Sequence, residues 1–233
     1  MRLDKFLANM GCGSRKEIKT LAKKKQIFVN KQVVKKTDIH IDPEQDQVEL
    51  AGQVISYKPF IYVMLHKPAG YISATEDPMH ETVLDLLMEQ DKVLEPFPVG
   101  RLDKDTEGLL LLTNDGLLAH DLLSPKKHIE KTYIAHVAKP ITTQDIKAFQ
   151  QGVILDDGYL TKPASLRELD DKVVEVIVTE GKFHQVKRMF EAVNNNVLYL
   201  KREVMGTLRL DPNLRLGEYR ELKKDEILQL KGK

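Results

Sequence analysis

The sequence Val99-Gly100-Arg101-Leu102-Asp103-Lys104-Asp105-Thr106-Glu107-Gly108, followed by four leucines at 109–112, decides how the larger part of this chain folds. The leucines form a short, continuous apolar run, which is typical of a buried strand. The charged and small residues before them predict a loop between Pro98 and that strand. Catalytic groups concentrate on loops that a rigid sheet holds in place. We therefore take this loop as a candidate active site.

Two other kinds of site fit the loop poorly. Asp103, Asp105, Glu107 and Gly108 stand at positions 1, 3, 5 and 6 of a calcium-binding EF-hand, but position 12 is Asn114 instead of Glu, and leucines occupy positions 8–10. The chain contains no Gly-x-x-x-x-Gly-Lys-Ser/Thr, so a phosphate-binding P-loop is excluded. An ordinary charged turn stays open as an alternative.

A second candidate segment runs from Thr179 to Phe190. It follows Val173–Val178, which is so rich in β-branched residues that we expect a central strand buried on both faces. Read as a helix, the segment places apolar residues on one side and polar residues on the other. The apolar side is Phe183, Val186, Phe190 and Val193, and the polar side is His184, Lys187, Arg188 and Glu191. The polar side is either a solvated basic face or a wall facing a carboxylate or RNA phosphates, and we leave His184 out of the catalytic set.

The remaining periodicity predicts helices near 81–89, 117–123 and 143–150 and strands at 60–65 and 132–138. Helices and strands mix without a regular βαβ alternation. This favours an α+β fold with a mixed or antiparallel central sheet flanked by helices. Tyr133 lies on the strand 132–138, where a tyrosine usually belongs to the core; if it faces a pocket, its ring can stack on a base.

The N-terminal 36 residues are strongly basic. They contain eleven Lys and Arg but only two acids, a net charge of +9, which leaves −8 for the other 197 residues. The apolar spacing of Leu3, Phe6, Leu7 and Met10 predicts a helix, and Ser14 to Glu17 forms a capping box before a second helix. Hairpins are expected over 27–34 and 48–55. We predict a polyanion-binding domain at 1–56, a linker at 57–60 and a second domain at 61–233.

Composition excludes several classes. The single cysteine, Cys12, rules out an internal disulfide framework and a multi-cysteine zinc site. No apolar run approaches the roughly 20 residues of a transmembrane helix, and the N-terminus shows no secretory signal. The seven histidines show no paired metal-ligand spacing, so we expect no metal. We expect a cytoplasmic protein, and a monomer because no coiled-coil seam is visible.

Several segments together resemble one enzyme family. The stretch Gly100-Arg101-Leu102-Asp103, with its glycine- and leucine-rich sequel, is similar to the signature of the RsuA-type pseudouridine synthases. The segments 66–71, 131–133 and 180–189 also resemble that family and stand in the same order. Residues 2–34 resemble the alpha-L motif, the small RNA-binding fold of a small-ribosomal-subunit protein. The resemblance covers essentially the whole chain, although the alpha-L motif alone occurs in many RNA-binding proteins.

The resemblance implies isomerisation of uridine to pseudouridine in ribosomal RNA without a cofactor or a metal ion. Asp103 matches the catalytic aspartate, Tyr133 the tyrosine that packs on the target base, and Val178 a small apolar position in the pocket. Lys187 matches the position of an arginine that pairs with the aspartate in many relatives; here its neighbour Arg188 is the alternative partner. The arginine two residues before the aspartate fills the space that the extruded base leaves.

We expect RNA contacts from basic residues of the first domain and of the cleft rim: Arg2, Lys5, Arg15, Lys16, Lys19, Lys23, Lys24, Lys31, Arg101, Lys104 and Arg188. Residues 97–116 look closest to the branch that modifies 16S rRNA, so the expected substrate is 16S rRNA in a partially assembled small subunit. The alternatives are a 23S rRNA synthase, a non-catalytic rRNA-binding assembly factor and a metal-dependent hydrolase, which would need convergent His, Asp and Glu ligands.

Overall fold

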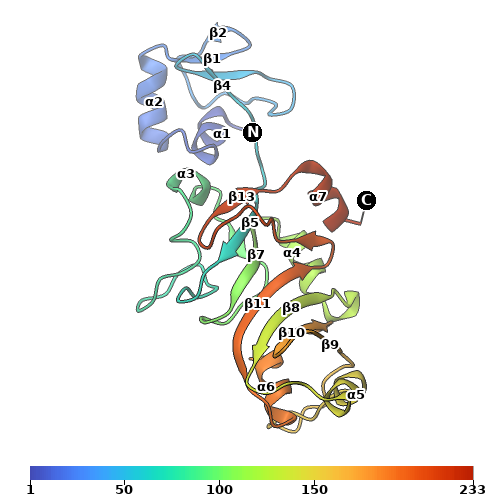
Figure 1. The fold of residues 1–233 in the computed structure, drawn as a ribbon. Coiled ribbons are helices and arrows are strands. Elements are labelled where there is room, and N and C mark those ends of the chain that lie inside the picture. The colour runs from blue at the N-terminus through green and yellow to red at the C-terminus, as the bar shows by residue number, and fades with distance from the viewer. Residues whose placement is uncertain (233) are drawn as a thin grey trace. The chain divides into compact units, whose positions relative to one another are not determined.

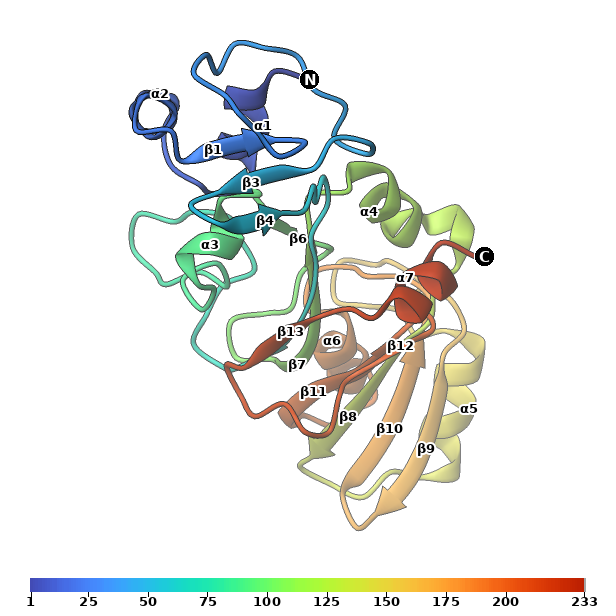
Figure 2. The ribbon, with the colours of Figure 1, turned by 90° about the horizontal axis from the view of Figure 1, so that it is seen from above.

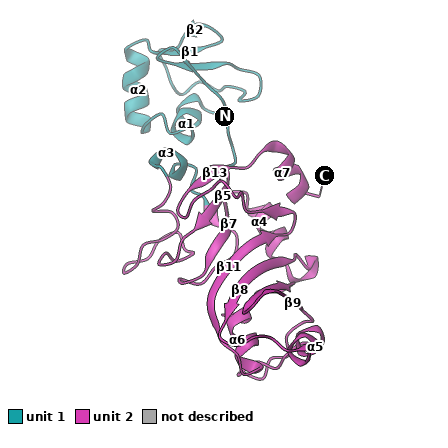
Figure 3. Ribbon diagram, viewed as in Figure 1, with its two compact units in different colours: residues 1–61, 88–96 teal, residues 62–87, 97–233 magenta. Residues whose placement is uncertain are grey.

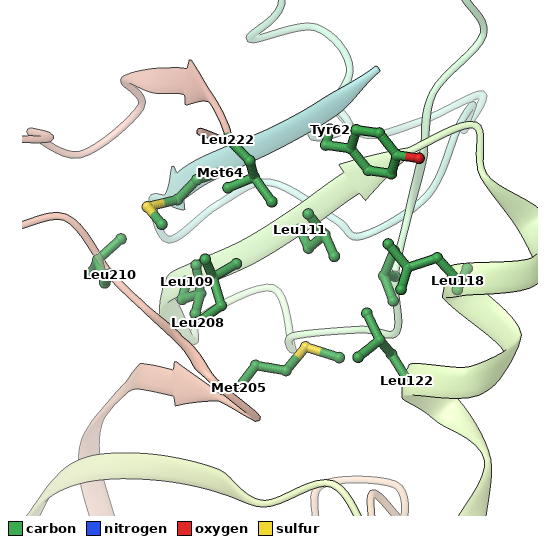
Figure 4. Packing of buried hydrophobic residues seen from close by; sticks show 12 residues of the cluster. Tyr62, Met64, Leu109, Leu111, Leu118, Leu122, Met205, Leu208, Leu210 and Leu222 are labelled. Carbon is green, nitrogen blue, oxygen red and sulfur yellow. The ribbon is translucent and has the colours of Figure 1, made fainter. Parts of the chain in front are cut away.

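The strand expected at the four leucines is β7 (Glu107–Thr113) in the computed structural model, which describes residues 1–232 (Figure 1). Leu109 and Leu111 face a core that also contains Tyr62 and Met64 (Figure 4). All four leucines are at most 1% exposed, so both faces of the strand are covered. Each buried leucine contributes about 1.5–3 kcal/mol of transfer free energy, so β7 contributes strongly to the stability of its unit.

The sheet around β7 has nine strands and is mixed. Its order is β13-β5-β7-β11-β8-β10-β9, with β6 paired to β7 and β12 to β11. The pair β7–β11 is parallel and the other pairs are antiparallel. This confirms the α+β class. The other strands are β5 (Tyr62–Lys67), β6 (Phe97–Pro98), β8 (Lys131–Val137), β9 (Ser165–Asp170), β10 (Val173–Val178), β11 (Val197–Met205), β12 (Leu208–Arg209) and β13 (Tyr219–Glu221).

The helices of this unit start where side chains cap them. The Asp115 carboxylate accepts from the Leu118 N–H at 3.1 Å, and Thr142 forms a capping box. The 117–123 and 143–150 helices are thereby confirmed. In Figure 2 α5 lies beside β9, and its Phe149 packs on Phe190 with ring centroids 5.0 Å apart. The helices are α4 (Gly116–Leu123), 3-10 helix η1 (Pro125–Lys127), α5 (Thr143–Gln151), α6 (Gln185–Ala192) and α7 (Lys224–Leu230).

Two expectations were wrong. The segment 81–89 is not a helix: it forms turns, followed by the short α3 (Glu89–Lys92). Here the Glu81 oxygen accepts from the Ile72 N–H at 3.1 Å and the Val83 N–H donates to the Ile72 oxygen at 3.0 Å, so the segment pairs with residues around Ile72 instead of continuing a helix. Strand β10 is buried on one face only, since Val174, Val176 and Val178 are buried and the residues between them are half-buried. The strands that are buried on both faces are β7 and its neighbour β5.

The other unit comprises residues 1–61 and 88–96 (Figure 3). Its helices pack on a four-stranded antiparallel sheet of order β2-β1-β3-β4. Ser14 and Glu17 form the expected capping box, and Leu3, Phe6 and Ile18 are fully or almost fully buried. The inclusion of 88–96 depends on packing between distant segments, and the linker expected at 57–60 stays a prediction. The elements are α1 (Leu3–Asn9), α2 (Arg15–Lys23), β1 (Ile27–Val29), β2 (Gln32–Val33), β3 (Val48–Leu50) and β4 (Gln53–Ile55).

Within residues 1–232, none of the helices combines the length and the apolar character needed to span a bilayer.

Candidate active site

The loop that carries Asp103 is held by one buried lysine. Lys67 ends β5 and is fully buried, and its ammonium donates to the main-chain oxygens of Pro68, Asp103, Lys104 and Thr106 at 3.0, 3.1, 3.3 and 2.9 Å. Burial lowers the pKa of Lys67 to about 8, although the nearby carboxylates act in the opposite direction. Three carbonyl groups of the loop therefore converge on a single amine.

Further hydrogen bonds fix the backbone on both sides of Asp103. The Ser73 hydroxyl accepts from the Leu102 N–H at 3.0 Å and donates to the Leu102 oxygen at 2.9 Å. The Gly70 N–H donates to the Lys104 oxygen at 2.7 Å, and the Thr106 N–H donates to the Asp103 oxygen at 3.0 Å. The backbone of Asp103 thus has little freedom to move.

Gly108 explains why the motif ends in glycine. Its φ is +107°, and a Cβ atom there would lie 2.3 Å from the Arg202 oxygen and 2.6 Å from its nitrogen. These two residues are partners in the parallel β7–β11 pair. Only glycine permits this approach, which starts β7 directly after the loop.

The Asp103 side chain faces α6. Its Oδ2 lies 3.3 Å from the Lys187 Nζ, and its Oδ1 lies 3.7 Å from the His184 Nε2. The same Lys187 ammonium donates to Asp105 at 2.6 Å, and this hydrogen bond lowers the pKa of Asp105 despite partial burial. One cation is therefore shared between two carboxylates of the loop. Asp103 stays 26% exposed, so its carboxylate can be reached from outside.

The start of α6 is set by a buried glutamine. The Gln185 amide donates to the Glu180 carboxylate at 2.7 Å and accepts from the Lys182 N–H at 2.8 Å. Glu180 also accepts from the Tyr159 hydroxyl at 2.8 Å. This network fixes the turn before the helix, so that Lys187 lies on the polar face.

Arg188 does not pair with Asp103. Its Nε donates to the Asp156 carboxylate at 2.5 Å, and its Nη2 lies 2.7 Å from Asp157. Of the two cations that the sequence left open, Lys187 is the one beside Asp103. Asp156 and Asp157 were not expected as partners, because nothing in their local sequence indicates a contact with the helix 30 residues later.

The position of Phe183 differs from the prediction for this helix. We expected it on the buried side, but it is 76% exposed, because the helix begins two residues later, at Gln185. Its ring stacks on the His184 imidazole, with centroids 3.8 Å apart and planes 16° apart. His184 itself has a left-handed φ of +47°. Val186 and Phe190 are buried as expected.

Two hollows meet at His184 and Lys187. One, of about 440 Å³, includes Gly70, Asp103 and Asp105 in its lining; the other, of about 510 Å³, includes Phe183 and Arg188. We call them the Asp103 hollow and the Phe183 hollow.

Tyr133 and Val178 line neither of these hollows. Both are buried on the sheet, and Tyr133 pairs with Arg202 of β11. The structure thus brings Asp103 and Lys187 together, and Tyr133 and Val178 are not among the residues that line the two hollows. Their expected roles stay predictions.

The basic residues expected to bind RNA are all on the surface except Arg188, which is half-buried. Arg101 and Lys104 are exposed on either side of Leu102 and Asp103. In the smaller unit, Arg2 is paired with Asp4 at 2.7 Å, so its charge is partly compensated. The others there are Lys5, Arg15, Lys16, Lys19, Lys23, Lys24 and Lys31.

The sequence reading missed Lys67, Ser73 and the acidic partners of Arg188. One signal was available for Lys67: it is the one charged residue at the end of an apolar strand, directly before Pro68-Ala69-Gly70. Within residues 1–232, the structure holds no group of three or more His, Cys, Asp or Glu side chains that could bind a metal ion.

Comparison with known proteins adds to this geometry. The profile described as RNA pseudouridylate synthase matches residues 61–192. The chain belongs to the RNA pseudouridylate synthase family. The S4 domain profile matches residues 1–48, so an S4 domain precedes the synthase domain. As a pseudouridine synthase the protein is an isomerase, and its substrate is RNA.

Relatives of this pseudouridine synthase align over nearly their whole length. It is 50% identical over 231 residues to an uncharacterized RNA pseudouridine synthase of Bacillus subtilis (strain 168), covering 97% of both chains. It is 39% identical to the ribosomal small subunit pseudouridine synthase A of Escherichia coli (strain K12), over 97% of this chain and 98% of that one. A crystal structure of a pseudouridylate synthase matches with a TM-score of 0.70 and 36% identity over 99% of each chain. The family resemblance and the expected fold are confirmed.

Proposed function

We propose that this synthase converts a uridine of small-subunit (16S) ribosomal RNA to pseudouridine, with Asp103 as the catalytic carboxylate. The observation that carries the proposal is the position of Asp103: its backbone is fixed, and its side chain is reachable and lies 3.3 Å from the Lys187 ammonium. Relatives from Escherichia coli and Yersinia pestis that are 39% and 41% identical are named ribosomal small subunit pseudouridine synthase A, which supports the choice of RNA.

The reaction exchanges one bond to the ribose for another. The bond from C1′ to N1 of uracil breaks, the ring turns, and a bond from C1′ to C5 forms. C5 loses its proton to solvent and N1 gains one, so the product is an isomer of the substrate. The ionised Asp103 carboxylate acts as nucleophile or base, and the Lys187 ammonium beside it stabilises that charge.

The target base must leave its stack to reach Asp103. Arg101 is exposed two residues before Asp103, where its side chain can occupy the vacated space. In this proposal, the Tyr133 ring packs on the extruded uracil and Val178 forms an apolar part of its pocket. Tyr133 is 9% and Val178 3% exposed, so only a small part of each side chain is available to the base.

The S4 domain supplies affinity in this proposal. Its exposed Lys and Arg side chains neutralise RNA phosphates with little sequence preference, and this attraction weakens as salt rises. The synthase domain then selects the nucleotide. We propose that the enzyme acts as a cytoplasmic monomer on a partially assembled small subunit.

The decisive measurement is tritium release from rRNA that carries 5-tritiated uridine. We expect release from 16S rRNA or partially assembled small subunits by the wild type and none by Asp103→Asn. Asp105→Asn is the matched control, because Asp105 also touches Lys187; we expect it to lose at most about tenfold in rate. Full turnover by Asp103→Asn would reject the assignment of the catalytic carboxylate.

The same assay separates the rival functions. Release from 23S rRNA instead of 16S rRNA would reject the proposed substrate and favour a large-subunit enzyme. No release from either RNA or from assembly intermediates would contradict a catalytic role and favour an rRNA-binding assembly factor. Loss of activity after chelation would contradict a reaction without metal.

A further inference from the structure

The Phe183 ring is exposed beside Lys187. Its side chain is 76% exposed although it stands directly before a helix whose apolar residues are buried. One face of the ring is covered by the His184 imidazole, 3.8 Å away between centroids. Single exposed apolar side chains are common on folded proteins, so what distinguishes Phe183 is that its ring stacks on His184 and lines a hollow beside Lys187.

This ring borders a hollow of suitable size. The Phe183 hollow measures about 510 Å³, within the range of about 300–1,000 Å³ that ligand sites occupy. Its wall of His184 and Lys187 is also the wall of the Asp103 hollow. A nucleotide in the Phe183 hollow would therefore lie next to one whose base is at Asp103.

The charges of the Phe183 hollow favour a base over a phosphate. Three carboxylates, Asp156, Asp157 and Glu191, line the hollow against two cations, Lys187 and Arg188, and Arg188 is bound by both Asp156 and Asp157. The Asp156 and Asp157 side chains remain 75% and 57% exposed, and an ionised carboxylate can only accept hydrogen bonds. They can take a bond from an exocyclic amino group, as Asp and Glu do from cytosine N4, and they repel a phosphate.

We propose that the Phe183 hollow is a subsite for an unpaired nucleotide adjacent to the target uridine. Its base stacks on Phe183, and its amino group donates to Asp156 or Asp157. Adenine, cytosine and guanine can donate from an exocyclic amino group, whereas uracil can donate only from its ring N3–H, so the subsite favours the three bases that carry an amino group. This inference rests on the proposed function, since it assumes an RNA strand in the Asp103 hollow. It makes Phe183 a determinant of which uridine is modified.

The test uses the full chain and separates KM from kcat by tritium release on rRNA. Stacking of one base on an aromatic side chain is worth about a tenfold or greater change in affinity. We expect Phe183→Leu to raise KM by about that factor with kcat nearly unchanged. Phe183→Tyr, which keeps an aromatic ring, should keep the wild-type KM. Leu117→Ala is the control, because Leu117 is also exposed, at 83%, and lies on α4 away from both hollows. We expect the control to keep both constants.

A second readout does not depend on turnover. Ultraviolet irradiation of the enzyme bound to 16S rRNA should give a nucleotide adduct on the peptide that contains Phe183, and the Phe183→Leu variant should lack it. Once the target is mapped, replacing its neighbour by uridine should lower kcat/KM, and Asp156→Asn together with Asp157→Asn should reduce that preference.

The outcomes distinguish this inference from the proposed function. A Phe183→Leu enzyme with an unchanged KM and no wild-type adduct at Phe183 would reject the subsite, even if the wild type releases tritium normally. Absence of tritium release by the wild type would reject the proposed function, and the adduct would still report whether Phe183 receives a base.

Discussion

The Lys67 ammonium donates a hydrogen bond to the main-chain oxygen of Asp103 at 3.1 Å, from a fully buried position at the end of β5. It thereby connects the strand next to β7 with the backbone of the residue proposed to react. Its other bonds, to Lys104 and Thr106 of the same loop, make it a positioning residue for that loop.

Replacing Lys67 should impair turnover more than RNA binding. In Lys67→Met the carbonyl groups of Asp103, Lys104 and Thr106 lose their shared donor, and the loop relaxes. A displacement of about 1 Å at a reacting group can cost about a hundredfold in rate, so we expect kcat to fall by about that factor. The affinity for rRNA should change less than threefold in filter binding.

Lys139→Met is the control for that variant, because Lys139 also donates to a main-chain oxygen, that of Asn194, outside the loop. Circular dichroism should show that both variants are folded. Wild-type kcat in Lys67→Met would show that the loop keeps its shape without the lysine.

The lowered pKa of Lys67 predicts a pH-dependent stability. The pKa is about 8 in the folded chain and about 10.4 when the chain is unfolded. Below pH 8 both states carry the proton, and the contribution is constant. Between pH 8 and about 10.4 the unfolded state holds more protons, so the free energy of unfolding rises with pH relative to Lys67→Met.

Urea unfolding of wild type and Lys67→Met at pH 7 and pH 9.5 measures this difference and cancels the titration of other groups. If the difference in unfolding free energy between the two proteins is the same at pH 7 and pH 9.5, the carbonyl oxygens keep Lys67 charged throughout this range.

Gly108→Ala should destabilise the synthase domain. The new Cβ would lie 2.3 Å from the Arg202 oxygen, so β7 and β11 must separate or shift. Gly158→Ala is a matched control, because Gly158 also has a positive φ, +82°, but open space around its Cβ position. We expect Gly158→Ala to lose about 1 kcal/mol and Gly108→Ala at least about 3 kcal/mol in urea unfolding. Equal losses of unfolding free energy in the two variants would show that the positive φ alone, and not the contact with Arg202, causes the destabilisation.

Replacing Lys187 should have a larger effect on catalysis than replacing Arg188. Lys187→Gln leaves the Asp103 carboxylate without its nearest cation, and we expect kcat to fall by about a hundredfold or more. Lys187→Arg should recover part of that loss, since a guanidinium can also pair with carboxylates. Arg188→Gln should keep more activity, because Arg188 pairs with Asp156 and Asp157. The reverse order in single-turnover assays would show that the pairing changes when RNA binds.

Removing charge from α2 should weaken RNA binding without affecting the active site. Lys16, Lys19 and Lys23 are exposed on this helix. Replacing all three by Gln should lower the affinity for rRNA. The slope of log K against log salt concentration should also become shallower, because up to about three fewer counterions are released on binding. The control replaces three exposed lysines of the synthase domain, Lys147, Lys172 and Lys224. Equal losses in the two triple variants would contradict a special role for the S4 domain.

Local interactions made much of this structure predictable from sequence. The leucines of β7, the Ser14–Glu17 capping box and the two N-terminal hairpins depend on residues within a few positions of one another. The spacing of apolar residues and the presence of capping residues directly reflect such short-range interactions. The candidate loop with Asp103 could also be identified from the sequence, because its motif is continuous and resembles that of a known family.

Which groups meet at the loop depends on contacts between distant parts of the chain. Lys187 lies 84 positions after Asp103 in the chain, and its choice over Arg188 depends on how α6 is seated by Gln185 and Glu180. Lys67 and the exposed ring of Phe183 likewise depend on neighbours from other elements. The sequence alone indicated most of the elements and the loop that contains Asp103, because those follow from adjacent side chains. Their partners were decided by packing across the sheet, which brings distant segments together and leaves no local pattern.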